Sequence, residues 1–214
     1  MTTVVLLHAD REVGRHLGDT LAASGFGLSG VADDLPSLRE ALAPGLPDVL
    51  IVDLRLRASH VQSVLASLRG RGQFGRPLIL ALTMSADDPR LLEALRQGAD
   101  GYFVQARSAL SLPSAIEQLC QGESTMSPQI ARQVKAQLDA RGWHDTEFGG
   151  DMQNPLRLNE SDRLLLQWTA EGYLVNEVAR GLQMSPQAVG VRMRTIYRKL
   201  QFDQRVRAGS SLVS

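Results

Sequence analysis

Short apolar runs alternate with longer amphipathic segments along the first 120 residues of the chain. The runs lie at residues 3–7, 26–32, 48–53, 77–82 and 101–104. Each run has the length of a strand, is rich in valine, isoleucine and leucine, and is too apolar for a strand with one face in water. Between them, spacings such as Val13, Leu17 and Leu21 indicate helices. The pattern predicts an α/β doubly wound sheet of five parallel strands, because helical crossovers join parallel strands.

Polar residues end or follow four of the predicted strands. They are Asp10, Asp53, Thr83 and Gln105. In doubly wound sheets the functional site lies at the C-terminal ends of the strands. We therefore expect these four side chains to gather at one edge of the sheet.

After about residue 120 the strand pattern stops. Ser127-Pro128 is a helix start, with serine as N-cap and proline in the first turn, and predicts a helix to about residue 140. Residues 141–155 have no periodicity, two adjacent glycines and a proline, which is typical of a linker. The sequence thus predicts three parts. They are a first domain at 1–122, a linker helix and flexible linker at 123–157, and a helical domain at 158–214.

The helical domain should begin with a capped helix. Asn159 can cap it together with Asp162, and Gly172 can end it. A short second helix is followed by Ser185-Pro186, which opens a third helix running to about Leu200. Two short helices joined by a tight turn are typical of a helix-turn-helix.

The third helix has two unlike sides in a helical projection. Its apolar face carries Val189, Met193, Ile196, Tyr197 and Leu200. The other side carries Gln187, Val191, Arg194 and Arg198, with Arg192 flanking the apolar face. Arginine pairs with guanine edges, glutamine with adenine, and valine can contact a thymine methyl group. We therefore expect Gln187, Val191, Arg192, Arg194 and Arg198 to contact double-stranded DNA, and a solvated helix face is the alternative interpretation.

Charge and composition support this division. The net charge is zero, but residues 1–150 carry 14 basic and 17 acidic residues, whereas residues 151–214 carry 9 and 6. No apolar run approaches the roughly 18 residues of a membrane helix, and the N-terminus lacks a signal-peptide pattern. We expect a cytoplasmic protein with no membrane partner. The single cysteine, Cys120, is expected to be a core thiol.

Particular motifs strengthen the expectation of DNA binding. AEG stands before the second C-terminal helix, NEVA within it, MS at the start of the third helix and IYRKL at its end. With these motifs, residues 158–202 resemble the LuxR/FixJ-type DNA-binding domain. Residues 3–120, with DVLIVD and GADGY, resemble the receiver domain of two-component response regulators. This domain order is typical of NarL/FixJ-type response regulators. The resemblance implies a transcription regulator and no enzyme, which binds a two-fold related DNA site as a homodimer and has a sensor kinase or a regulatory protein as partner.

The resemblance also assigns roles at the edge of the sheet. Asp53 would be the phosphoacceptor, Thr83 the switch hydroxyl and Tyr102 the switch aromatic residue. Phosphorylation of an aspartate requires a divalent cation, which Asp10, Asp53 and the backbone carbonyl of Arg55 would hold. Mg²⁺ is therefore the only cofactor implied, and only if the receiver is phosphorylatable.

Three positions of this pocket depart from the family pattern. Ala9 stands where a second acidic residue is implied, Met84 where a small residue is implied, and Gln105 where a lysine is implied. A neutral amide cannot supply the charge of an ammonium group, and charge-assisted hydrogen bonds are roughly twice as strong as neutral ones. We therefore expect a pseudo-receiver that acts without phosphorylation, with Asp53 kept as a structural carboxylate bonded to backbone amides.

The DNA-binding part departs from the family as well. Gly190 stands where a lysine is usual and Arg192 where a histidine is usual, so that one DNA contact should be missing. The family ends in a fourth helix used for dimerisation, whereas this chain has Gly209, Ser210 and Ser211 there. We expect a weak dimer through this segment.

Three other functions are open on the sequence. The first is a conventional response regulator that a sensor histidine kinase phosphorylates on Asp53. The second is a phosphohydrolase with Asp53 as nucleophile, which is disfavoured because Arg55 stands where such enzymes have a second aspartate. The third is a protein-interaction module that regulates without DNA.

Overall fold

The protein is described by a computed structural model that covers residues 1–69, 75–105, 111–139 and 158–210. Its contacts divide the chain into two compact units, Met1–Gln121 and Gly122–Ser214. The linker predicted at residues 141–155 lies outside the described residues. Within the described ranges, no helix is long and apolar enough to cross a membrane.

The first unit is built on a five-stranded parallel sheet with the strand order β2-β1-β3-β4-β5. The strands are β1 (Thr3–Leu7), β2 (Gly27–Ala32), β3 (Val49–Asp53), β4 (Leu78–Thr83) and β5 (Gly101–Val104). The predicted doubly wound fold is therefore confirmed. All five apolar runs form strands, and β2, β3 and β4 begin one residue later than predicted.

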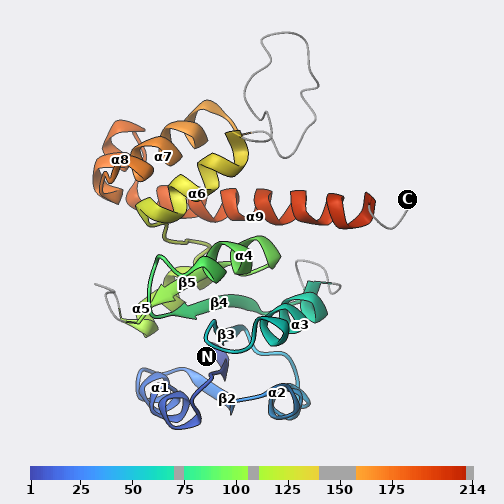
Figure 1. The fold of residues 1–214 in the computed structure, drawn as a ribbon. Coiled ribbons are helices and arrows are strands. Elements are labelled where there is room, and N and C mark those ends of the chain that lie inside the picture. The colour runs from blue at the N-terminus through green and yellow to red at the C-terminus, as the bar shows by residue number, and fades with distance from the viewer. Residues whose placement is uncertain (70–74, 106–110, 140–157, 211–214) are drawn as a thin grey trace. The chain divides into compact units, whose positions relative to one another are not determined.

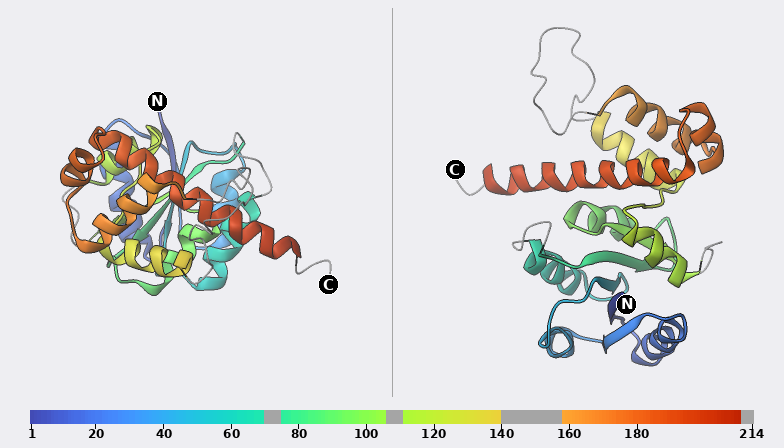
Figure 2. Two further views of the ribbon diagram at one scale, coloured as in Figure 1. Left: turned by 90° about the horizontal axis from the view of Figure 1, so that it is seen from above. Right: turned by 180° about the vertical axis from the view of Figure 1, so that it is seen from behind.

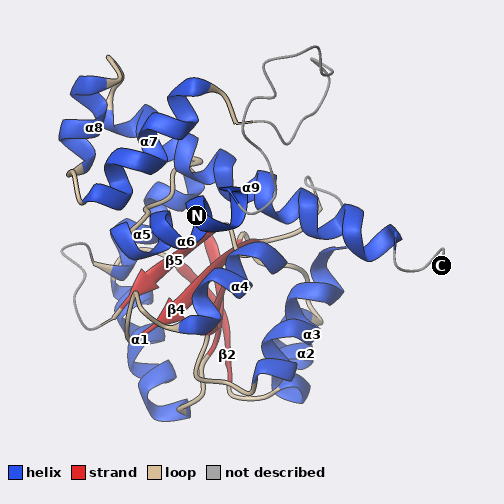
Figure 3. Ribbon diagram, turned by 45° about the horizontal axis from the view of Figure 1, so that its top comes forward, coloured by secondary structure: helices blue, strands red, loops and turns tan. Residues whose placement is uncertain are grey.

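Helices alternate with the strands and cover both faces of the sheet. They are α1 (Arg11–Ala23), α2 (Leu35–Leu42), α3 (Ala58–Arg69), α4 (Pro89–Gln97) and α5 (Leu112–Cys120). Helices α1 and α5 lie on one side of the sheet, and α2 and α3 lie on the other (Figure 3). Strand residues alternate between the two faces. One core cluster accordingly joins Val4, Leu6, Ile51 and Leu82 to Leu21 of α1 and Ile116 of α5.

A buried ion pair fixes the beginning of β4 and β5. Both guanidinium nitrogens Nη1 and Nη2 of Arg76 lie 2.9 Å from the carboxylate oxygens of Asp100. The side chains are 9% and 1% exposed. The amide of Ile79 also donates to Asp100, at 2.9 Å. The carboxylate therefore ties the loop before β5 to the first residues of β4.

The second unit is helical. Its helices are α6 (Pro128–Asp139), α7 (Glu160–Glu171), α8 (Val175–Gly181) and α9 (Pro186–Ser210), which Figure 1 shows in yellow to red. The predicted helix starts are confirmed, because the Ser127 and Ser185 hydroxyls accept from the amides of Ile130 and Ala188. Asn159 and Asp162 form the predicted capping box. Gly172 ends α7 with a φ of 100°.

The end of α9 differs from the prediction. We expected this helix to stop at about Leu200, but α9 continues without a break to Ser210 (Figure 2). No glycine or proline stands between Leu200 and Gly209, so nothing in this stretch interrupts the helical backbone. The dimerisation expected of this segment stays a prediction.

The expectation for Cys120 was wrong, since this thiol is exposed. Helix α5 buries Leu112, Ile116 and Leu119, which are spaced by one helical turn each. Cys120 is one residue beyond Leu119 and therefore points away from that buried stripe.

Candidate functional site

The strand order places a topological switch point between β1 and β3, where ligands of doubly wound folds bind. Asp53 is the last residue of β3 and is 1% exposed. His8, directly after β1, and Thr83, the last residue of β4, are also buried. The structure thus gathers His8, Asp53 and Thr83 at the edge of the sheet where a functional site was expected.

The carboxylate of Asp53 is surrounded by donors from the chain itself. The amide of Ala9 donates to Oδ2 at 3.0 Å, and the amide of Arg55 donates to Oδ1 at 2.9 Å. The Arg55 guanidinium adds Nε at 3.2 and 3.1 Å from the two oxygens and Nη2 at 3.0 Å from Oδ2. Asp53 therefore has a cation in direct contact with both carboxylate oxygens.

His8 completes this group. Its Nε2 lies 2.8 Å from Nη2 of Arg55 and 3.4 Å from Oδ2 of Asp53. A guanidinium can only donate, so Nε2 is the acceptor in its contact with Arg55. Nδ1 lies 2.5 Å from the carbonyl oxygen and 3.0 Å from the amide nitrogen of Asp10. His8 thus helps to position the Arg55 guanidinium beside the Asp53 carboxylate.

Asp10 is the N-cap of α1 in the structure. Its Oδ1 accepts the amides of Glu12 and Val13 at 3.0 and 3.1 Å, as the N-cap of α1. The hydrogen bond from the Val13 amide is the main reason that the pKa of Asp10 lies below its ordinary value. The carboxylate is exposed and bound to the start of a helix.

Thr83 is held by the start of α4. Its hydroxyl lies 3.1 Å from Oδ2 of Asp88, the N-cap of α4, and 3.1 Å from the carbonyl of Ser85. Arg90 donates to Asp88 through Nε and Nη2, both at 2.8 Å. Burial raises the pKa of Asp88, but hydrogen bonds from Arg90 lower it more, so that the net shift is downward. The carboxylate of Asp88 is thereby kept charged as the acceptor for Thr83.

The other predicted pocket residues lie nearby. Met84 is 47% exposed and lines, with Arg55 and Arg90, an open hollow of about 570 Å³. Gln105 follows β5 and its amide donates to the carbonyl of Thr83 at 2.8 Å. The ring of Tyr102 is buried in β5. Sequence reasoning did not identify two residues of this site. They are His8, which contacts Arg55 and Asp53, and Asp88, which contacts Thr83 and Arg90.

These residues do not fit a bound divalent cation. Such a cation needs several oxygen ligands. The carboxylate of Asp10 caps α1, and Asp53 already faces the guanidinium of Arg55. Nowhere in the described ranges do three potential ligands of the His, Cys, Asp and Glu types form a metal-binding group.

A second candidate site is the outer side of α9. Gln187, Val191 and Arg198 are exposed, as the helical projection predicts, and Thr195 lies beside them. The hydroxyl of Thr195 donates to the carbonyl of Val191, which leaves its methyl group toward solvent. These side chains form a mixed polar and apolar ridge with one cation, which can contact base edges and phosphates.

The expectation for Arg194 was wrong, because this residue is 4% exposed and does not face solvent. Residues 122–126, which precede α6, run along this side of α9. The amide of Ser124 donates to the carbonyl of Gly190 at 3.0 Å, and the hydroxyl of Tyr197 donates to the carbonyl of Thr125 at 2.8 Å. Arg194 lies between these two contacts on the helix. A projection of α9 alone could not include a segment that starts more than 60 residues earlier.

Arg192 and Lys199 turn toward α7. Nζ of Lys199 lies 2.8 Å from Oδ2 of Asp162, and Nη1 of Arg192 lies 3.7 Å from its Oδ1. Asp162 is 3% exposed. Two cations of α9 are thus paired inside the domain, and the predicted DNA contact of Arg192 stays a prediction.

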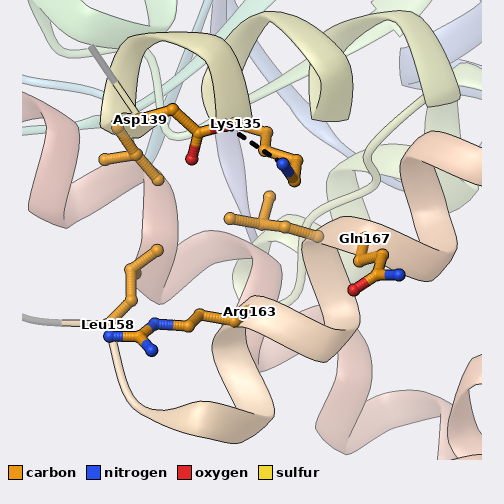
Figure 4. Close-up of a pocket in the computed structure, with 7 residues that line it drawn as sticks. Lys135, Asp139, Leu158, Arg163 and Gln167 are labelled. Carbon is orange, nitrogen blue, oxygen red and sulfur yellow. Dashed lines mark hydrogen bonds and ion pairs between the residues drawn. The ribbon is translucent and has the colours of Figure 1, made fainter. Parts of the chain in front are cut away.

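A smaller hollow opens between α6 and α7. It measures about 160 Å³, and its apolar lining residues are Leu138, Leu158 and Leu166. Figure 4 shows this hollow. On its rim, Lys135 pairs with Asp139 at 3.0 Å, and Arg163 and Gln167 lie on the opposite side. No sequence pattern predicts this hollow, because its two walls come from separate helices.

Known proteins are similar to this chain both in its C-terminal residues and along most of its length. The model of the luxR family of bacterial regulatory proteins matches residues 158–211. The chain is 30% identical over 182 residues to a nitrate/nitrite response regulator protein homolog of Haemophilus influenzae, over 83% of this chain and 81% of that protein. It is 26% identical to the nitrate/nitrite response regulator NarL of Escherichia coli K12, over 76% and 71% of the two chains.

Solved structures share the fold over most of the chain. The response regulator RcsB of Salmonella typhimurium has a TM-score of 0.50 and 22% identity, over 93% of this chain and 91% of RcsB. An RcsB–DNA complex has a TM-score of 0.52 and 20% identity, over 94% and 92%.

Proposed function

Since this chain belongs to the NarL-type response regulators with a LuxR-family DNA-binding domain, we propose that it regulates transcription by binding DNA without phosphorylation of Asp53. The observation that carries the proposal is the Arg55 guanidinium on both oxygens of Asp53. The protein is then a transcription regulator and not an enzyme, and its receiver-like unit acts as a pseudo-receiver.

The contacts of Asp53 support a structural role. Phosphoryl transfer requires a free oxygen of the aspartate to attack and a divalent cation to offset the charge of the phosphoryl group. Here both oxygens accept backbone amides and face Arg55. The guanidinium would have to leave before a phosphoryl donor could approach, and charge-assisted hydrogen bonds oppose its departure.

The surroundings of Thr83 support the same conclusion. A switch hydroxyl transmits phosphorylation only if it can turn toward the phosphoryl group. The hydroxyl of Thr83 is held by Asp88, which Arg90 keeps in place. At position 105, glutamine cannot supply the cation that a lysine would bring to the phosphoryl group.

The DNA-binding role rests on α9 and on the relatives. Gln187, Val191 and Arg198 face solvent on the helix that follows the turn. RcsB has been solved bound to DNA, also as two dimers on two parallel DNAs. We infer that a homodimer of this chain binds a two-fold related site on double-stranded DNA, with affinity that falls as salt rises.

One observation favours the conventional alternative, in which a sensor kinase phosphorylates Asp53. The Arg55 side chain is 38% exposed and can swing into solvent. Such a movement would uncover Asp53.

Treatment with a phosphodonor separates the two functions. We expect the intact mass of the protein to stay unchanged after incubation with acetyl phosphate and Mg²⁺, because Arg55 covers Asp53 and the cation site lacks ligands. The Asp53→Asn variant serves as the control. A mass gain of one phosphoryl group that this variant abolishes would establish the conventional regulator instead.

A further inference from the structure

Residues 122–126, named the latch segment here, lie alongside two turns of α9. Its Ser124 amide and Thr125 carbonyl bond to Gly190 and Tyr197 at 3.0 and 2.8 Å. Met126 and Ser124 are buried, and so is Arg194 between the two hydrogen bonds. All these residues belong to the C-terminal unit. The contact is thus a feature of that unit itself.

Gly190 makes this approach possible. A Cβ atom at this position would lie 3.1 Å from Cβ and 3.2 Å from Oε2 of Glu123. Glycine is unfavourable inside a helix, so its presence in the second turn of α9 fits a close contact with the latch segment. A side chain at this position would require Glu123 to shift by a few tenths of an ångström.

The latch segment limits how α9 can meet DNA. A major groove is about 12 Å wide and accommodates one helix, whose diameter with side chains is about 10–12 Å. With an extended segment packed beside Gly190, Arg194 and Tyr197, the inserted element is wider than the groove. The carboxylate of Glu123 would also approach the phosphates.

We propose that residues 122–126 are an autoinhibitory latch that must leave α9 before this helix can enter a major groove. The proposal rests on the function proposed above and adds its regulation. Only Gln121 separates the latch segment from α5, the last helix of the receiver-like unit. The latch segment exchanges between a docked state on α9 and a released state, and DNA binds the released state. Release exposes Arg194, which adds a second cation to the DNA-binding ridge.

The docked state is held with limited stability. The hydroxyl of Ser124 is buried and has no hydrogen-bond partner among the residues that the structure describes. A buried polar group without a partner is unfavourable. Ser124→Ala should therefore strengthen docking, whereas Tyr197→Phe, which removes the hydrogen bond to Thr125, should weaken it.

A reversible crosslink tests the latch. The Cβ atoms at positions 123 and 190 come close to the roughly 3.5–4.5 Å of a disulfide. We expect the Glu123→Cys/Gly190→Cys protein, in a Cys120→Ser background, to bind DNA about tenfold or more weakly when oxidised than when reduced. The two single-cysteine proteins serve as controls and should show no redox effect.

The variants Tyr197→Phe and Ser124→Ala should change the affinity for DNA in opposite directions. Tyr197→Phe should bind DNA up to about fivefold more tightly than the parent, and Ser124→Ala more weakly. Amide exchange at Ser124, which does not require DNA, should be faster in Tyr197→Phe. Equal DNA affinity of the oxidised and reduced crosslink protein would overturn the latch and leave the DNA-binding function standing. Absence of DNA binding by every variant would overturn the proposed function itself, and the latch with it.

Discussion

Replacing Asp100 with alanine is expected to lower the free energy of unfolding of the receiver-like unit by about 3–5 kcal/mol. The substitution leaves the buried Arg76 guanidinium without its carboxylate and the Ile79 amide without its acceptor. Removing one partner of a buried ion pair is costly because the remaining charge stays desolvated. Native-state hydrogen exchange of the β4 amides measures this free energy, because these core amides exchange when the receiver-like unit unfolds.

Arg11→Ala is the matched control in the same unit. Arg11 and Asp33 form an ion pair at 3.9 Å with side chains that are 62% and 34% exposed. Solvent screens this pair, and its loss should cost at most about 1 kcal/mol. If Asp100→Ala were no more harmful than Arg11→Ala, the buried pair would not hold β4 and β5 together.

Replacing Asp162 with alanine should lower the free energy of unfolding of the C-terminal unit by about 2–3 kcal/mol. The buried carboxylate binds Lys199 and Arg192 of α9 and closes the capping box of α7. Its loss removes a connection between α7 and the helix expected to contact DNA. Exchange of the amides of α9 between Val189 and Leu200 reports the effect.

Glu160→Ala tests whether this loss is specific. Glu160 is an exposed acidic residue in the first turn of the same helix. Its negative charge lies near the N-terminal end of the helix dipole, so its replacement should lower the free energy of unfolding by at most about 1 kcal/mol. Comparable losses in the two variants would show that Asp162 acts only as a first-turn charge.

Local patterns were sufficient to predict most of the fold. The five apolar runs form strands because they are short, apolar and bounded by helical patterns, and Gly172 and Ser185 end and start helices through their own backbone and side chain. The end of α9 was missed because the apolar face used to predict the helix ends at Leu200, whereas the residues up to Gly209 contain no helix breaker and continue it.

The candidate site could be predicted only in part. Asp53 and Thr83 were placed by strand ends, which are local features. The contact of Arg55 with Asp53 and His8 depends on the direction of a long side chain, which no spacing gives. Arg194 is buried in the folded chain, and a projection of one helix alone contains no information about the segments that pack beside it.

Selection from random double-stranded DNA with the unphosphorylated full-length protein tests the central claim most directly. We predict that the protein enriches a two-fold related sequence, and that Asp53→Asn, run in parallel, enriches the same sequence. Replacement of Gln187 by alanine should change the preference at one position in each half-site, because we propose that this exposed side chain contacts a base edge. Enrichment that occurs only after treatment with acetyl phosphate and Mg²⁺, and never with Asp53→Asn, would contradict phosphorylation-independent DNA binding.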